Sequence, residues 1–155
     1  MKYQFSVNIL APRETVWSIV QNTDLRPQWD VRVAQYITHG APAVGTKVTI
    51  VFRAVFFRPV GHGEFLRFDP PSQSILRINE IDSSLIPPGG GTWLLEDIAG
   101  GTRMTTRFNL KPSKFGFPGD ALITTFAYID TMRSLRKLRR LVMKLQRNSV
   151  TAATQ

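Results

Sequence analysis

One segment of this chain, residues 119–147, restricts the possible folds more than any other. Its sequence, GDALITTFAYIDTMRSLRKLRRLVMKLQR, has the spacing of an amphipathic helix. The apolar positions that form its stripe are Leu122, Phe126, Ile129, Leu135, Leu138, Val142 and Leu145. At 1.5 Å per residue such a helix would be about 43 Å long. Because an apolar stripe must be buried against another element, the rest of the chain has to supply a large apolar surface.

The rest of the chain consists mostly of short segments in which polar and apolar residues alternate. Residues 2–10 alternate strictly, which predicts a half-buried strand. Pro12 then favours the start of a helix that contains Trp17, and a short helical turn is expected over residues 24–29. Further extended segments are predicted at 31–37, 47–56, 60–68, 73–81, 92–98 and 102–110. Turns rich in Gly and Pro separate them, which favours an antiparallel meander.

This order of elements predicts an α+β domain in which a curved antiparallel sheet of about seven strands wraps around the long helix. The chain has 155 residues, which suits one domain over 1–148, followed by a frayed polar tail over 149–155. The N-terminal sequence MKYQFSVNIL does not resemble a signal peptide, and no apolar stretch reaches the roughly 20 residues of a membrane span. The chain has no cysteine. We therefore expect a cytoplasmic protein.

The charge of the chain is concentrated in one segment. The formal net charge is +9, and residues 133–147 carry seven bases and no acid, which leaves 13 bases against 11 acids elsewhere. Three interpretations remain: a solvated helix face, a contact with an acidic protein, ribosome or RNA, or a contact with an anionic membrane. The bases expected to contact such a partner are Arg136, Lys137, Arg139 and Arg140.

The element order and several short motifs resemble the START-like helix-grip superfamily, in particular the polyketide cyclase/dehydrase and lipid-transport group (SRPBCC). The resemblance covers nearly the whole chain. Its motifs are APRETVWSIV at 11–20, Trp29–Asp30, VGTKV at 44–48, FDPP at 68–71, LLED at 94–97 and GGTRMT at 100–105, ahead of the long helix. The resemblance implies a helix-grip fold with an internal cavity between the sheet and the C-terminal helix. It also implies that Trp17 is a core residue, whereas Trp29 is either a cavity residue or a core residue.

The residues expected to line this cavity are mostly large and apolar. They are Trp29, Phe52, Trp93, Leu95, Met104, Phe108, Phe126 and Ile129. The alternative is that they pack only against one another. Known ligand sites of this kind are concave and largely apolar, with a few polar groups.

The segment VGHGEFLRF at 60–68 holds the only candidate catalytic pair. If its even positions face inward, His62 and Glu64 enter the cavity and could act in acid–base chemistry. Gly61 and Gly63 instead favour a bulge that would change which residues face inward. Glu80 is another possible buried acid, although a solvated strand end is the preferred interpretation.

The sequence contains no motif for metal binding, cofactor binding or nucleophilic catalysis. With two histidines and no cysteine, no metal site is expected, and no phosphate-binding loop, dinucleotide motif or nucleophile elbow occurs, so no cofactor is expected. The Gly-Gly-Gly run at 89–91 is predicted to form a hairpin loop, and the loops at 54–59 and 84–91 to control access to the cavity.

The resemblance and these observations together imply three possible functions. The first is binding or transport of a small hydrophobic or lipid-like molecule. The second is a polyketide aromatase/cyclase-like activity, which requires titratable groups inside the cavity. The third is an interaction protein of the quinone-binding or ribosome-associated type that acts through the basic helix. Whether the protein is an enzyme is left open.

Overall fold

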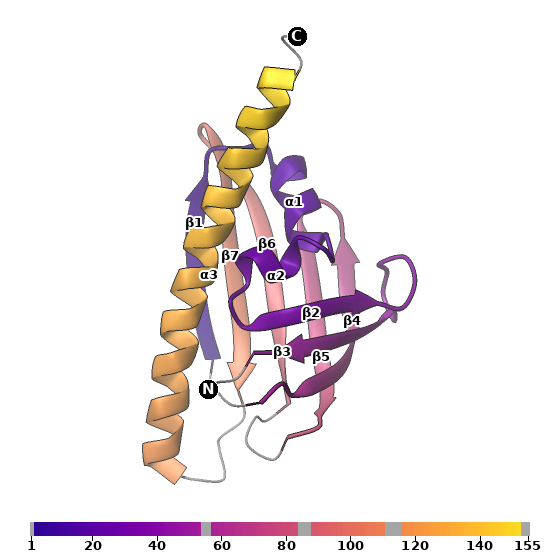
Figure 1. Ribbon diagram of the computed structural model, residues 1–155, viewed down its shortest axis with the longest axis vertical. Helices are drawn as coiled ribbons and strands as arrows, with labels where there is room; N and C mark the ends of the chain where they lie inside the picture. Colours follow the sequence, from indigo (N-terminus) through magenta and orange to yellow (C-terminus); the bar gives the residue numbers. More distant parts are fainter. Residues whose placement is uncertain (1, 54–56, 84–87, 111–115, 153–155) are drawn as a thin grey trace.

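The computed structural model describes residues 2–53, 57–83, 88–110 and 116–152. The chain forms one curled antiparallel sheet with three helices on its concave side (Figure 1). The sheet has seven strands in the order β1-β7-β6-β5-β4-β3-β2. Their bounds are Lys2–Ile9, Val33–Thr38, Lys47–Phe52, Val60–Asp69, Gln73–Ile81, Gly89–Ile98 and Gly101–Leu110, numbered β1 to β7 along the chain. The predicted helix-grip architecture is confirmed.

The meander from β2 to β7 follows the chain order, and only β1 pairs out of sequence, with β7. The two segments that cross from β1 to β2 are α1 (Arg13–Gln21) and α2 (Arg26–Trp29). Asn22 precedes α2, and its side-chain oxygen accepts hydrogen bonds from the backbone N–H groups of Asp24 and Leu25. This turn, followed by Pro27 in the first turn of α2, places the short helix beside α3 and in contact with β2 (Figure 1).

The C-terminal helix α3 spans Gly116–Ala152, 37 residues, or about 55 Å at 1.5 Å per residue. It begins three residues before the predicted segment and continues to Ala152, within the stretch expected to be a frayed tail. Figure 1 shows it crossing the sheet lengthwise, beside β1.

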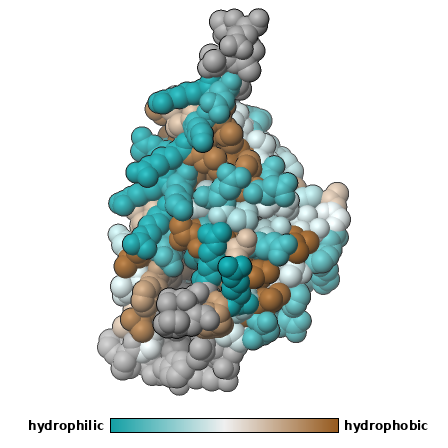
Figure 2. Space-filling model, viewed as in Figure 1, coloured by the Kyte–Doolittle hydropathy of each residue, from teal (hydrophilic) through white to brown (hydrophobic). Residues whose placement is uncertain are grey.

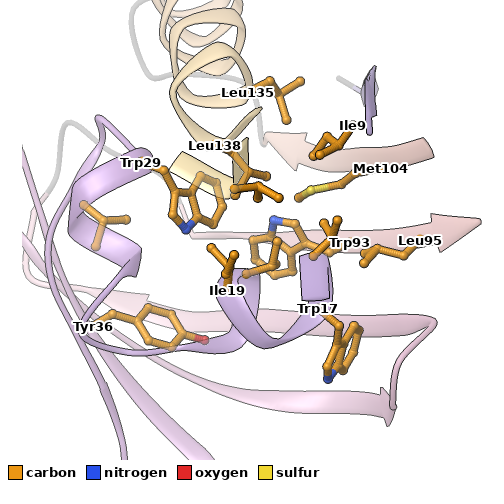
Figure 3. Close-up of a cluster of buried hydrophobic side chains, with 14 of the residues drawn as sticks. Ile9, Trp17, Ile19, Trp29, Tyr36, Trp93, Leu95, Met104, Leu135 and Leu138 are labelled. Atoms are coloured by element: carbon orange, nitrogen blue, oxygen red, sulfur yellow. The ribbon is translucent and has the colours of Figure 1, made fainter. Parts of the chain in front are cut away.

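The second half of α3 closes the hydrophobic core. Leu135, Leu138 and Val142 are all buried, and Figure 3 shows Leu135 and Leu138 above Trp29 of α2 and Trp93 of β6. Trp17 of α1 is also buried, and its ring centre lies 5.4 Å from that of Phe68 (its neighbour on β4). The prediction that Trp17 is a core residue is confirmed.

The first half of α3 contributes less to the core than the sequence predicts. Phe126 is 55% exposed and Ile129 is 38% exposed, so neither lines a cavity, and that prediction is wrong. Two contacts with β1 fix the rotation of the helix here. The Thr124 hydroxyl hydrogen-bonds the Tyr3 hydroxyl at 2.6 Å, and the Tyr128 ring packs against Phe5. With 3.6 residues per turn, this orientation directs Phe126 and Ile129 away from β1 and outward.

Candidate functional site

A cavity of about 270 Å³ lies between the concave face of the sheet and the helices. Strands β3, β6 and β7 supply aromatic walls through Phe52, Trp93 and Phe108. Ala127 closes it from α3 with a small side chain. The segment around α2 contributes Arg26, Asp30 and Arg32, and the remaining lining is mostly apolar apart from Arg53, Thr106 and Asn109.

The predicted cavity residues divide into three groups. Phe52, Trp93 and Phe108 line the cavity as expected. Leu95 and Met104 are buried in the core but are not part of the cavity wall, so for them the prediction is wrong. The reason is their place along β6 and β7, where they sit beneath the tightly packed second half of α3 (Figure 3).

Trp29 is a core residue and does not line the cavity. Its side chain is 1% exposed, and the cavity wall is formed instead by Arg26, one helical turn earlier. Trp29 therefore supports the site from behind, because its ring packs against the guanidinium group of Arg26. The expectation that it is a ligand-contacting residue is wrong for this physical reason.

The charged wall consists of Arg26, Asp30 and Arg32. Arg32 grips the Asp30 carboxylate with two hydrogen bonds, from Nε to Oδ1 at 3.0 Å and from Nη2 to Oδ2 at 3.1 Å. Arg26 approaches the same carboxylate from α2, with Nη2 3.3 Å from Oδ2. Asp30 is 1% exposed and Arg26 is 4% exposed. Two cations thus share one anion inside the protein.

Aromatic rings enclose the guanidinium of Arg26. Its Cζ lies 4.4 Å from the ring centre of Trp29, 4.4 Å from that of Trp93 and 5.3 Å from that of Tyr36. The faces of aromatic rings carry negative charge density and attract a cation, so the rings replace part of the water lost on burial.

Helix α3 is attached to the same network through two hydroxyl groups. Ser134 donates to Asp30 Oδ1 at 3.4 Å and accepts a hydrogen bond from the backbone N–H of Val31 at 3.1 Å. Thr131 accepts from Arg32 Nη1 at 3.4 Å. Ser134 and Thr131 are both buried, so these short polar side chains replace apolar core residues where the helix faces the charged wall.

The carboxylate of Asp30 is ionised at neutral pH. Burial alone would raise its pKa, but the charges of Arg32 and Arg26 and the hydrogen bonds from Arg32 outweigh that effect and lower the pKa to about 2. Burial alone would lower the pKa of Arg32, but the charge of Asp30 and its hydrogen bonds raise it, whereas burial lowers the pKa of Arg26. Asp30 therefore serves as a fixed negative charge and not as a proton donor.

Sequence reasoning missed the two arginines. It identified Trp29–Asp30 only as a family motif, although Arg26 precedes Asp30 by one helical turn and Arg32 follows it by two residues. Two bases flanking an acid beside a tryptophan is a signal that could have been recognised. The burial of these charged residues could not have been recognised from the sequence, because α2 is only four residues long and shows no helical stripe.

His62 and Glu64 lie on the outer face of the sheet, so the expectation of an interior pair is wrong. Both Lys47 and Arg77 donate hydrogen bonds to Glu64, at 2.6 and 2.7 Å, and these lower its pKa to about 2. The odd positions of β4 face inward from Gly61 to Phe65, and an extra residue between Phe65 and Arg67 then turns Phe68 inward, against Trp17. A Cβ at Gly63 would lie 2.2 Å from the carbonyl oxygen of Arg77, so only glycine is accommodated at this inward position.

The glycine run at 89–91 belongs to β6 and is not a hairpin loop, which corrects the sequence prediction. Gly90 pairs with Arg77 and Gly91 with Leu76, and both glycines line the cavity. Glu80 is exposed, as the preferred interpretation expected. The proposed access loops fall largely on residues 54–56 and 84–87, which lie outside the described residues.

A larger hollow of about 910 Å³ lies mainly on the outer face of the sheet. It shares Gly89, Gly90, Gly91 and Asn109 with the internal cavity, because glycine leaves the wall between them thin. The internal cavity is the better candidate site, because buried charges and aromatic rings meet there and because the sheet, the α2 segment and α3 all contribute to its wall.

Membrane spans and metal centres are both missing from the part of the chain that the structure describes. Its helices include none that is long and apolar enough to cross a bilayer. The His, Asp and Glu side chains of the described residues nowhere form a group of three that could hold a metal ion.

Solved structures with the same fold cover almost the whole chain. A protein of Thermus thermophilus superposes with a TM-score of 0.77 at 19% identity, covering 94% of this chain and 99% of its own. A conserved protein from Geobacillus kaustophilus gives 0.76 at 14% identity, covering 93% and 96%. A START superfamily protein from Mycobacterium smegmatis gives 0.76 at 13% identity, covering 93% and 98%. At these identities the likeness establishes the fold alone.

No curated protein matches the sequence. The family model described as polyketide cyclase/dehydrase and lipid transport matches residues 1–143, which include every element that forms the cavity. The chain therefore belongs to the polyketide cyclase/dehydrase and lipid transport family.

Proposed function

We propose that this protein binds or carries a small hydrophobic or lipid-like molecule in the cavity between the sheet and α3. The observation that carries the proposal is the cavity itself, which combines aromatic walls from three strands with one cluster of polar groups. Small-molecule sites typically have this composition, with apolar walls supplying affinity and a few polar groups fixing orientation. Family membership supports the same class of ligand.

The cavity has a volume of about 270 Å³ among the described residues, which suits a small guest such as a medium-length alkyl chain or two linked aromatic ring systems. Burial of the guest's apolar surface would contribute about 25 cal/mol per Å².

Filling the cavity from the helix side tests the proposal. Ala127→Leu adds a branched side chain at a cavity-lining position, and Ala121→Leu adds the same group at an exposed position of α3. Fluorescence titration with the neutral probe N-phenyl-1-naphthylamine should show weaker binding to the Ala127 variant and unchanged binding to the Ala121 control. Equal binding by both variants would refute the cavity as the site.

The aromatase/cyclase-like alternative loses its proposed acid–base pair, since His62 and Glu64 lie outside the cavity. A cyclase of this design would have to shape its substrate with Arg26, Arg32 and the aromatic walls. Turnover of a linear poly-β-ketone analogue that survives loss of either arginine would exclude that version of the mechanism.

A second candidate function is contact with an anionic partner through α3. Arg136, Arg139, Arg140 and Lys144 line one shallow depression on the helix, which is the observation that favours it. Figure 2 shows hydrophilic side chains along this part of the helix. Reversal of Arg136, Lys137, Arg139 and Arg140 to Glu should abolish binding to polyanionic heparin beads at low salt. If both the unmodified protein and the variant stay bound to the heparin beads, and added salt does not release either of them, the proposal is contradicted.

A further inference from the structure

The charged wall of the cavity carries more positive than negative charge. Arg26, Arg32 and Arg53 line the cavity, and Asp30 is the one acid among its described lining residues. Asp130 of α3 lies near enough to raise the pKa of Arg32, but it is not part of the cavity wall. Buried charges are normally paired, because removing an ion from water costs several kcal/mol. The cavity wall therefore favours an additional anion.

The atoms without partners also indicate which group would complete the site. Among the described residues, three buried side-chain polar atoms have no hydrogen-bond partner, and one of them, Nε of Arg26, belongs to a residue that lines the cavity. It is an N–H donor. Buried donors in proteins almost always find an acceptor. Arg26 is only 4% exposed and lines the cavity, so its unpartnered donor calls for an acceptor at this wall.

The guanidinium of Arg32 also has N–H donors that its hydrogen bonds do not use. Its hydrogen bonds run from Nε and Nη2 to Asp30 and from Nη1 to Thr131. A guanidinium carries more N–H groups than these contacts occupy, arranged in a fork that matches two carboxylate oxygens. Its side chain is 29% exposed, unlike that of Arg26, so it remains accessible from the cavity.

We propose that the cavity selects a carboxylate-bearing amphiphile, whose anionic head meets Arg32 and Arg26 while its apolar tail packs against Phe52 and Phe108. This inference rests on the proposed binding function and names the class of ligand. Asp30 would then hold the two arginines in position, and the bound carboxylate would supply the second negative charge. The rings around Arg26 keep that cation in place when no ligand is bound.

The outer hollow has the same sign of charge. Lys2, Arg77 and Arg107 line it, and its described lining residues include no acid. Arg77 is held by Glu64 and Arg107 by Gln4. Because the glycine run 89–91 lies between this hollow and the cavity, cationic side chains stand on both sides of the thin wall and favour anions near it.

Three probes with the same alkyl chain and different heads test the proposal on the unmodified protein. Isothermal titration calorimetry at pH 7.5 would compare decanoate, decanol and decylammonium below their aggregation limits. We expect decanoate to bind at least about tenfold more tightly than decanol, because only its charged head can accept charge-assisted hydrogen bonds from the arginines. Decylammonium should bind most weakly.

Removal of the proposed head-group ligand should erase this discrimination. Arg32→Gln should lower the affinity for decanoate at least about tenfold and leave that for decanol within about twofold. Arg67→Gln is the matched control, since Arg67 is an exposed arginine on the outer face and its loss changes the net charge equally. Arg32→Lys keeps the charge but loses the fork, and should retain part of the preference.

The outcomes separate this inference from the proposed function. Equal affinity for decanoate and decanol would overturn the carboxylate inference while leaving a hydrophobic carrier in place. Binding of none of the three probes would overturn both. If Arg32→Gln does not fold, the comparison of the three heads on the unmodified chain still decides the matter, because it needs no variant.

Discussion

The guanidinium carbon of Arg26 lies 4.4 Å from the centre of the Trp93 ring. This contact joins the one-turn helix α2 to a central strand of the sheet and buries a positive charge where an aliphatic residue would be expected. The core of this protein and its candidate site are therefore one structure. Changes to the charged wall will alter stability and ligand binding together, and experiments must separate the two.

Asp30 should be the most sensitive member of the charged wall. Asp30→Asn leaves the buried guanidinium of Arg26 and the partly buried one of Arg32 without their anion and should destabilise the protein by about 3–5 kcal/mol. Arg26→Met removes one of the two cations and leaves a neutral Arg32–Asp30 pair, so it should cost less. Urea unfolding followed by tryptophan fluorescence would compare the stabilities of the two variants. A larger loss of stability in Arg26→Met than in Asp30→Asn would contradict the assigned charges.

Acid should weaken the fold over a defined range. The pKa of Asp30 is about 2 in the folded protein, below its ordinary value of 3.8. A depressed folded-state pKa contributes stability that is complete above the unfolded value and is lost as the pH falls through the folded one. We expect a loss of about 2 kcal/mol between about pH 4 and pH 2.

Stability measured by urea unfolding across this range would show that loss in the unmodified chain. Asp30→Asn should lack this component, because it has no proton to take up at that position. An identical pH dependence in both proteins would show that other carboxylates are responsible.

The two halves of α3 should respond differently to truncation. Leu138 is fully buried, and Leu138→Ala should cost about 2–5 kcal/mol through lost burial and the cavity left behind. Phe126 is 55% exposed, and Phe126→Ala should change stability by no more than about 0.5 kcal/mol. Thermal unfolding of both variants would check this, and equal losses would mean that the first half of α3 packs against the sheet.

Because His62 and Glu64 lie on the outer face of the sheet, we predict that their removal does not change ligand affinity. His62→Gln combined with Glu64→Gln should leave affinity for N-phenyl-1-naphthylamine unchanged, because neither side chain lines the cavity. Fluorescence titration would measure this against Ala127→Leu as the positive control. A clear loss of affinity in the double variant would place the pair at the site after all.

Local patterns predicted the elements well because strict alternation and helical spacing are properties of neighbouring residues. The strand over residues 2–9 and the start of α1 after Pro12 are examples. The run at 89–91 was misjudged, because glycine is typical of loops and only pairing with β5 makes it a strand. In β4 an extra residue between Phe65 and Arg67 changes the inward parity, and such a shift depends on pairing with the neighbouring strand.

By itself the sequence determined the fold class, the order of the elements and the basic end of the last helix. Each of these depends on spacing along the chain. Only the tertiary structure decided that Phe126 faces outward, that Trp29 lies behind the cavity wall, and that Arg26 and Arg32 share Asp30. Those features depend on how α2 and α3 are rotated against the sheet, and contacts between residues far apart in the chain, such as Ser134 with Asp30, set that rotation.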